Sequence, residues 1–438
     1  MSKVKYREVA VVAEIKQSIN PNDDLSQSYK SFVLVMLTIT YVFNFIDRQI
    51  LTVLQESIKK ELLLSDTHLG FLSGLAFAAF YVTVGIPVAR LSDKYNRRTI
   101  ISISLGLWSA MTALCGAAAN FVHLLLARIG VGVGESGSSP AAHSMISDYF
   151  SERRRATALS VYSTGIYIGI LVGASLGGWL DQEYGWRVAF LMLGIPGVLF
   201  ALIFFFIVKE PARNRNVISE QNSDSRDTFW YVFKYLLTKK SFIFISLGVG
   251  FHSFMAYALN FLAPFLSRVH EMSTAEAGYW TGMTMGIGGA IGALTGGYLA
   301  DKLGHKDKRW YVKISGYGLF IAIPCLALSY LTSNTSIMLT ALFIGYTSLS
   351  LFLAPSIAIV HSIVPNNMRA FSSAILFFVL NFIGLGLGPI FVGIVSDLLV
   401  ADFGNLSLRW ALLSTLFAGV ISVICFFRAA KYVNEDIV

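Results

Sequence analysis

The stretches VARLSDKYNRRT, at residues 88–99, and GGYLADKLGHKDKR, at residues 296–309, follow one pattern. In each, an apolar segment ends in Asp-Lys, a tight turn follows, and a cluster of basic residues comes next. Asp93 in the first stretch therefore matches Asp301 in the second. A motif that returns in the same order half a chain later predicts two halves with the same internal layout.

The composition predicts that both halves lie in a membrane. Of the 438 residues, 55% are hydrophobic and 14% are charged, whereas soluble globular proteins carry about 25% charged residues. A helix that spans a bilayer needs roughly 20 mostly apolar residues, and the sequence contains twelve such segments. The first six are expected at 31–55, 69–91, 99–119, 121–145, 155–180 and 187–208. The last six are expected at 241–267, 274–299, 311–331, 335–361, 370–397 and 408–429.

These spans predict an all-α membrane protein with twelve transmembrane helices in two six-helix parallel repeats. The expected parts are a cytoplasmic N-terminal segment (1–30), an N-terminal half (31–208), a cytoplasmic linker (209–240), a C-terminal half (241–430) and a cytoplasmic tail (431–438). The first thirty residues have no apolar core, so they are not expected to be a cleavable signal peptide.

The distribution of lysine and arginine predicts the orientation of the chain. One set of loops contains the basic clusters, and the opposite set is poor in them apart from Lys59 and Lys60, which lie beside Glu56 and Glu61. Both termini and the linker are therefore expected in the cytoplasm, with a bacterial inner membrane as the location. The net charge of +8 follows from this topology, so no nucleic-acid partner is expected.

A second repeat is found where the fifth and eleventh spans begin. Arg155 and Arg369 each precede an alanine, and a glycine-rich run follows at a similar distance. In the fifth span the glycines come every four residues, at Gly165, Gly169, Gly173 and Gly177. Small residues at this spacing allow two helix backbones to approach closely.

The Asp-Lys loops resemble the signature loop of the major facilitator superfamily, G-x-x-x-D-[RK]-x-G-[RK]-[RK]. The second copy keeps Gly297, Asp301, Lys302 and Gly304, and the first keeps Asp93, Lys94, Arg97 and Arg98 but has Ala89 and Asn96 in place of the glycines. The resemblance implies the fold of these transporters over residues 31–430. The loops would suit a latch, because an Asp near a helix end can pair with a cation or the N-terminus of a neighbouring helix. A plain basic cytoplasmic loop is the alternative.

Few charged residues lie well inside the predicted spans, away from their ends. A charge in the middle of a membrane costs a few kcal/mol or more, so such residues usually face a cavity and have a function. They are Asp47 and Arg48 in NFIDRQIL (44–51), Arg128 and Glu135 in the fourth span, and His252 in the seventh. The acids among them all belong to the N-terminal half.

The depth of these residues predicts how they pair. At 1.5 Å per residue, Asp47 and Arg128 both lie about 10–15 Å below the outer surface, so an Asp47–Arg128 pair is expected. Glu135 follows Arg128 by two turns, on nearly the same face and about 10 Å deeper. Arg48 points about 100° away from Asp47, toward the cavity or the outer headgroups.

This arrangement suits proton coupling. An acid in a low dielectric holds its proton more tightly, and a nearby arginine opposes that effect. The hypothesis is that Asp47 and Glu135 exchange protons while Arg128 binds an anionic headgroup. A static salt-bridge network between the first and fourth spans is the alternative.

Aromatic residues of the seventh span predict the other wall of the cavity. Phe254, Tyr257 and Phe261 would face the charged side, where Asp47, Arg48 and Arg128 lie, and would suit an amphiphile. His252 would titrate near neutral pH or serve as a polar lining residue. The alternative is that these aromatic side chains face lipid.

The segments that contain FIDRQIL (45–51) and GVGES (132–136) are similar to the Spinster branch of the superfamily. The resemblance implies a proton-coupled exporter of lysophospholipids or sphingoid molecules, which works by alternating access. The aromatic cavity would suit hydrophobic drugs equally, and a monomer is the default expectation. Its partners would be this substrate, protons and membrane lipids. A symporter of a small organic anion and an uncoupled lipid scramblase are the alternatives. An enzyme is not expected, because metalloprotease HExxH and paired GxGD aspartates are missing, and the three scattered cysteines indicate neither metal nor cofactor.

Overall fold

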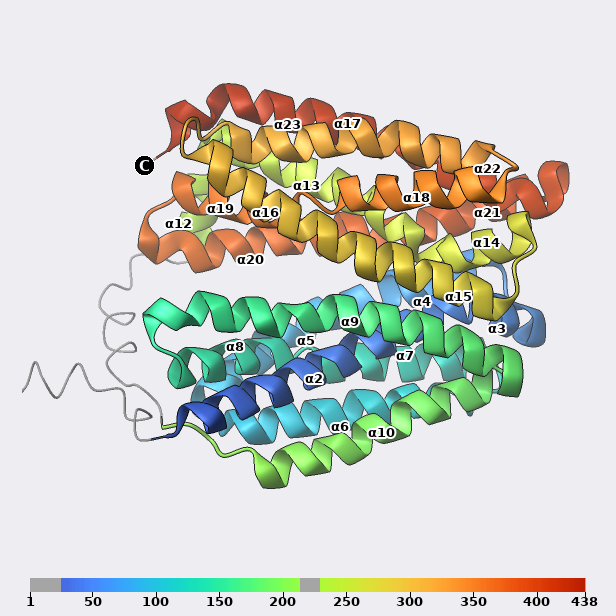
Figure 1. Cartoon of the computed structure of the whole chain (residues 1–438), viewed down its shortest axis with the longest axis horizontal. Coiled ribbons are helices and arrows are strands. Elements are labelled where there is room, and N and C mark those ends of the chain that lie inside the picture. Colours follow the sequence, from blue (N-terminus) through green and yellow to red (C-terminus); the bar gives the residue numbers. More distant parts are fainter. Residues whose placement is uncertain (1–24, 213–228, 438) are drawn as a thin grey trace, which may run out of the picture.

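The computed structural model describes residues 25–212 and 229–437, and this part of the chain is helical without strands (Figure 1). Twelve helical passes run back and forth along the long axis of the molecule. Those from α2 to α10 form one bundle, drawn in blue to green, and those from α12 to α23 form the other.

The first bundle has six passes, and two of them are interrupted. The passes are α2 (Gln27–Val53), α4 (Asp66–Ser73) with α5 (Leu75–Lys94), α6 (Arg97–Cys115), α7 (Phe121–Glu135) with α8 (Ser138–Tyr149), α9 (Glu152–Tyr184) and α10 (Trp186–Ile207). The short helix α3 (Gln55–Leu62) lies between the first two passes.

The second bundle repeats this order with more interruptions. Its passes are α13 (Lys240–Ala258) with η1 (Leu259–Phe261) and α14 (Leu262–His270), α15 (Thr274–Gly282) with η2 (Met283–Gly288) and α16 (Gly289–Gly304), α17 (Trp310–Leu331), α18 (Thr335–Leu349) with α19 (Leu353–Ile363), α20 (Arg369–Val379) with η4 (Leu380–Leu387) and α21 (Gly388–Phe403), and α22 (Ser407–Ser414) with α23 (Leu416–Asp436). Short 3₁₀ turns, η3 (Asn366–Met368) and η5 (Gly404–Leu406), precede the last two passes.

Nine helical segments within the described residues are long and apolar enough to cross a membrane, and the last of them, Arg369–Asp436, contains two passes. The two passes outside this set, at 121–149 and 274–304, contain buried charges or many glycines, which lower their hydropathy. The predicted twelve-helix fold is thus confirmed, with helix ends that differ from the expected ones by a few residues.

Part of the predicted linker is helical. Residues 229–238 form α12 (Phe229–Thr238), which packs against α13 and α20 of the second bundle. Val232 and Leu236 of this helix are fully buried in the hydrophobic core. Most of the predicted N-terminal segment and the polar middle of the linker lie outside the described residues.

The two ends of the molecule differ in what they contain. We call the end where α2 begins and α23 ends the terminal end (left in Figure 1), and the opposite end the distal end. The bundles contact each other closely toward the distal end, where α9 packs against α15 and α4 packs against α21. A Cβ atom added at Gly178 of α9 would lie 2.5 Å from the carbonyl oxygen of Thr274 at the start of α15.

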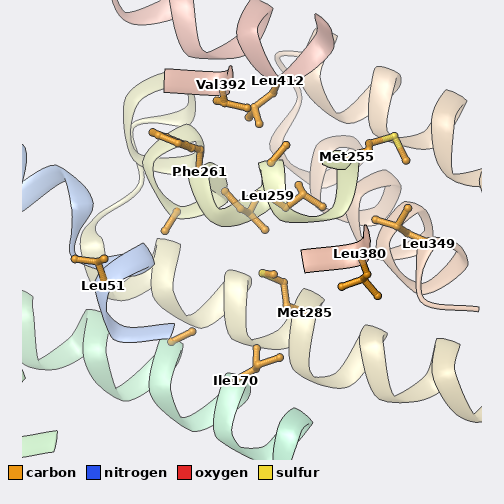
Figure 2. Close-up of a cluster of buried hydrophobic side chains, with 14 of the residues drawn as sticks. Leu51, Ile170, Met255, Leu259, Phe261, Met285, Leu349, Leu380, Val392 and Leu412 are labelled. Atoms are coloured by element: carbon orange, nitrogen blue, oxygen red, sulfur yellow. The ribbon is translucent and has the colours of Figure 1, made fainter. Parts of the chain in front are cut away.

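The glycine stripe of α9 faces α2, as close helix packing predicts. A Cβ atom added at Gly169 would lie 2.6 Å from the Cβ atom of Phe45 and equally close to the carbonyl oxygen of Val42. The resulting core is continuous between the bundles (Figure 2): Leu51 and Ile170 of the first bundle belong to the same buried cluster as Phe261 of the second. Helix α2, which contains Asp47 and Arg48, is therefore held in place by side chains of its own bundle and of the second bundle.

Candidate functional site

The four charged residues predicted in the first and fourth spans come together between α2 and α7. Asp47, Arg128 and Glu135 are buried to 2% exposure or less. The side chain of Arg48 is 23% exposed. Arg48 is therefore the accessible charge of this cluster, which we call the buried charge cluster.

The ion pair in the cluster differs from the predicted one. The Nε atom of Arg48 lies 2.6 Å from Oε2 of Glu135. Arg128 donates from Nη1 to the backbone carbonyl oxygen of Asp47, at 3.1 Å, rather than to its carboxylate. The expected Asp47–Arg128 side-chain pair was therefore wrong, because the rise per residue fixes the depth of a side chain but not the direction in which it points.

The carboxyl group of Asp47 faces a third helix. Its Oδ2 atom accepts a hydrogen bond from Ser109 Oγ of α6, at 3.2 Å. One oxygen of Asp47 and one of Glu135 are buried and have no partner among the described residues. A buried carboxylate with an unsatisfied oxygen is costly, so each acid has a position where a proton would be accommodated.

Aromatic rings surround the partly exposed guanidinium of Arg48. The Cζ atom of Arg48 lies 5.1 Å from the ring centre of Phe45, 4.8 Å from that of Phe77 and 5.0 Å from that of Tyr81. Tyr257 of α13, in the second bundle, and Tyr81 pack against the same hydrophobic cluster, to which Phe77 belongs. Cation–π contacts of this kind stabilise the charge without neutralising it, so the guanidinium stays available to an anion.

The structure places the other predicted lining residues elsewhere. The His252 ring is buried and stacks on Phe352, with centroids 3.7 Å apart. Phe254 packs against Phe391 and Phe417 within the second bundle. Of the predicted aromatic wall, Tyr257 packs against the cluster that contains Phe77 and against which Tyr81 also packs. The expectation that Phe254 faces the charged side was wrong, because helical spacing puts Phe254 near the face of Tyr257 but does not determine which neighbouring helix each ring meets.

The first Asp-Lys loop has its described polar contacts within one bundle. Arg97 is buried and pairs with Asp148 at the end of α8 and with Glu210 just past α10. The backbone nitrogen of Arg98 donates to the same Glu210 carboxylate. The side chains of Asp93 and Lys94, at the end of α5, lie outside the described part of the structure.

In the second loop, Asp301 and Lys302 are exposed at the end of α16, and Lys302 lies over the Tyr298 ring at 5.6 Å. The described contacts of both loops thus leave the predicted latch between the halves as a hypothesis.

A charged cluster at the distal end was missed. Arg268 of α14 binds Asp66 at the start of α4 through two nitrogens, at 2.6 Å each, and binds Glu56 of α3 through Nε, also at 2.6 Å. Asp397 of α21 accepts hydrogen bonds from the backbone nitrogens of Asp66 and Thr67. We call these five residues the distal clasp.

The clasp joins the two bundles, because Glu56 and Asp66 belong to the first and Arg268 and Asp397 to the second. Its sequence signal was the unusual group of charged residues around Lys59, in loops that are otherwise poor in basic residues. Lys59 contacts Asp66 at 2.6 Å.

Two six-helix bundles with a buried charge cluster inside the first are the layout expected of a multi-pass membrane transporter. Residues 37–385 and 247–436 match the Major Facilitator Superfamily. The chain belongs to this superfamily, in its Spinster branch. Its relatives are transporters and efflux pumps, so the protein is an integral membrane transporter and not an enzyme.

Individual relatives cover nearly the whole chain. The chain is 33% identical to an MFS-type efflux pump of Mycolicibacterium smegmatis, over 92% of this chain and 93% of the relative. It is 28% identical to protein spinster homolog 1 of Xenopus laevis, over 93% and 82%. A solved bacterial homologue of the human lysosomal transporter Spinster, in an inward-facing and unoccupied conformation, matches with a TM-score of 0.84 and 30% identity, over 94% of this chain and 99% of that one.

Proposed function

We propose that the protein is a proton-coupled exporter of amphipathic anions or zwitterions, of the lysophospholipid or sphingoid type, or of hydrophobic drugs. The observation that carries this proposal is the Arg48–Glu135 pair, in which an accessible guanidinium neutralises a fully buried carboxylate. The relative named as an efflux pump supports export as the direction. In this proposal the termini are cytoplasmic, as the Lys/Arg distribution predicts, so the terminal end would face the cytoplasm. The membrane would be a bacterial inner membrane, as the short loops and compact length suggest.

The pair would couple a substrate to a proton. A phosphate or sulfonate group that binds Arg48 draws the guanidinium away from Glu135. Leaving a buried carboxylate without its counter-charge is costly by about 3–5 kcal/mol, and a proton taken up by Glu135 removes that cost. An anion alone at Arg48 would thus be bound together with a proton, which is the behaviour of a symporter. For export against the proton gradient, the cationic group of a zwitterionic substrate would take the place of the proton beside Glu135, so that substrate and proton bind in alternation. Arg48, rather than the buried Arg128, is the anion-binding residue in this proposal.

Asp47 and Arg128 would have a supporting role. Because Arg128 binds the backbone carbonyl of Asp47, it holds the helix segment that presents Arg48 on the next residue. Asp47, with one free carboxyl oxygen, is the second proton-accepting position.

The rings around Arg48 favour an amphiphile. Phe77 and Tyr81 of the first bundle and Tyr257 of the second belong to or pack against one hydrophobic cluster, which also includes Leu385. A charged headgroup at Arg48 would therefore place its apolar chain along aromatic and aliphatic side chains from both bundles.

Transport in proteoliposomes tests the proposal. A labelled lysophospholipid is followed with and without an imposed pH gradient, for the unchanged protein and for Asp47→Asn, Glu135→Gln and Arg48→Gln. Asp181→Asn is the matched control, because Asp181 is also a buried acid of the first bundle but bonds to Ser57, away from Arg48. We expect gradient-driven movement that the control keeps and the three variants lose.

Other outcomes distinguish the alternatives. Proton movement with compact carboxylates but not with lysophospholipid would indicate a symporter of small organic anions. Equal lipid movement in all proteins, independent of the gradient, would indicate a scramblase and would make the charge cluster structural.

A further inference from the structure

A pocket at the terminal end of the second bundle is separate from the buried charge cluster. It lies where α19 ends, α20 begins and α23 ends, and its volume is about 440 Å³. Its lining consists of Lys308, His361, Ser362, Val364, Pro365, Arg369 and Ile437. Two of these residues are cationic and none is acidic, so the lining carries net positive charge.

The nearest acids in the sequence are engaged elsewhere. Asp307, next to Lys308, accepts hydrogen bonds from the backbone and side chain of Arg309. Asp436, next to Ile437, accepts hydrogen bonds from the backbone and side chain of Ser241. Among the described residues, which end at 437, these contacts leave the positive charge of the lining without a carboxylate from its immediate chain neighbours.

The first bundle contains a matching site, at the start of α9, which can be compared with this pocket at the start of α20. Arg155 donates to the carbonyl oxygen of Ser147, eight residues earlier, and Arg369 donates to that of His361, also eight residues earlier. The two corners are therefore built alike, and by this spacing Asp148 of the first bundle matches Ser362 of the second.

The matching corners differ in charge. In the first bundle, Asp148 and Glu210 neutralise Arg97. The second bundle thus has Ser362 at the place where the first has the Asp148 carboxylate, and a pocket is found there.

We propose that this pocket binds a phosphate group, which supplies the negative charge that Asp148 supplies at the matching place in the first bundle. Lys308 and Arg369 would contact the phosphate oxygens, and the hydroxyl group of Ser362 would donate a hydrogen bond. Arg369 is already oriented by its bond to the His361 carbonyl, and His361 is fixed by a 2.6 Å contact with Ser373. The phosphate belongs either to the headgroup of an anionic phospholipid or to a soluble anion.

Binding to the purified full-length protein tests this inference. Native mass spectrometry and thermal unfolding in a neutral detergent are measured with phosphatidylglycerol, with phosphatidylcholine and with inorganic phosphate. Lys308→Gln removes one charge whose described contact is with the Tyr311 ring, so we expect a folded protein with about fivefold weaker binding. Ser362→Asp puts a carboxylate where the first bundle has one, and we expect it to abolish binding.

Lys302→Gln is the matched control, because Lys302 is an exposed cation at the same end but does not line the pocket. Phosphatidylglycerol binding that only the two pocket variants weaken would identify a lipid headgroup. The same pattern with inorganic phosphate alone would identify a soluble anion. Equal binding by the unchanged protein and both pocket variants, or no binding of either probe, would overturn the proposal. Because these assays need no transport, their outcome is independent of the proposed transport function.

Discussion

Replacing Arg268 by alanine should open the distal end. Arg268 is 10% exposed and binds Asp66 and Glu56, whose side chains are 3% and 13% exposed. Removing one partner of a buried ion pair costs about 3–5 kcal/mol. The cost applies to the state in which the distal clasp is closed, because opening would hydrate both acids.

The magnitude follows from this difference between the two states. Even the lower figure, about 3 kcal/mol, multiplies the ratio of distal-open to distal-closed molecules by more than about 100. A protein that is almost entirely distal-closed would then populate both states measurably. Spin labels at Glu183 and Asn334, which are exposed at the distal end of opposite bundles, report the change by pulsed electron paramagnetic resonance. The three native cysteines are first replaced by serine.

The control for this experiment is Arg187→Gln. Arg187 pairs with Glu61 at the same end, but both residues belong to the first bundle and the pair is largely exposed. We expect this variant to leave the distance distribution unchanged. A distribution for Arg268→Ala that equals that of the unchanged protein would refute the role of the clasp in holding the distal end closed.

Further predictions concern stability. Gly169→Ala should lower the free energy of unfolding by about 1–3 kcal/mol, because the added methyl group meets α2. Gly177→Ala is the control and should change it little, because the nearest atom to its added methyl group is 3.6 Å away. A thermal or denaturant unfolding assay measures both. Arg97→Gln should destabilise the protein by about 3 kcal/mol or more, since it leaves Asp148 and Glu210 without their buried partner, and unchanged unfolding would contradict this. Hydrogen bonds from Trp186 and Arg187 lower the pKa of Glu61 below its ordinary value of 4.5, so the stabilisation from this carboxylate is present above that value and is lost as the pH falls through the lowered pKa. The unfolding midpoint of Glu61→Gln should therefore show a weaker dependence on acid pH than that of the unchanged protein.

The helices and their number were predictable because each pass has its own local signal. Roughly 20 apolar residues between polar loops suffice to define a span, and the Asp-Lys repeat indicates the two halves. The stripe that includes Gly169 predicted close packing, and the structure shows which helix it meets. Local patterns also located Asp47, Arg48, Arg128 and Glu135 as charges in an apolar setting.

The pairing of these charges was not predictable in the same way. Whether Arg48 or Arg128 meets Glu135 depends on the rotation of α2 against α7, which is set by packing of many side chains and not by the sequence near the charges. The contacts of the distal clasp are even less predictable from the sequence, because Arg268 is separated from Glu56 by 212 residues and from Asp66 by 202. Contacts at such separation are consequences of how the bundles meet.

The buried charge cluster and the distal clasp are connected by one segment of the chain, which consists of α2 and α3. The first bundle contributes all four members of the buried charge cluster, while the second contributes Tyr257 beside it and Arg268 in the distal clasp. Arg48 lies in α2, and Glu56 lies in α3, which begins two residues after α2 ends. A rotation or tilt of α2 that accompanies loss of the Arg48–Glu135 pair would therefore act on Glu56 through about two turns of helix. This short connection gives a physical route by which the protonation of a buried acid can bias the closure of the distal end, because both equilibria depend on the position of one helix.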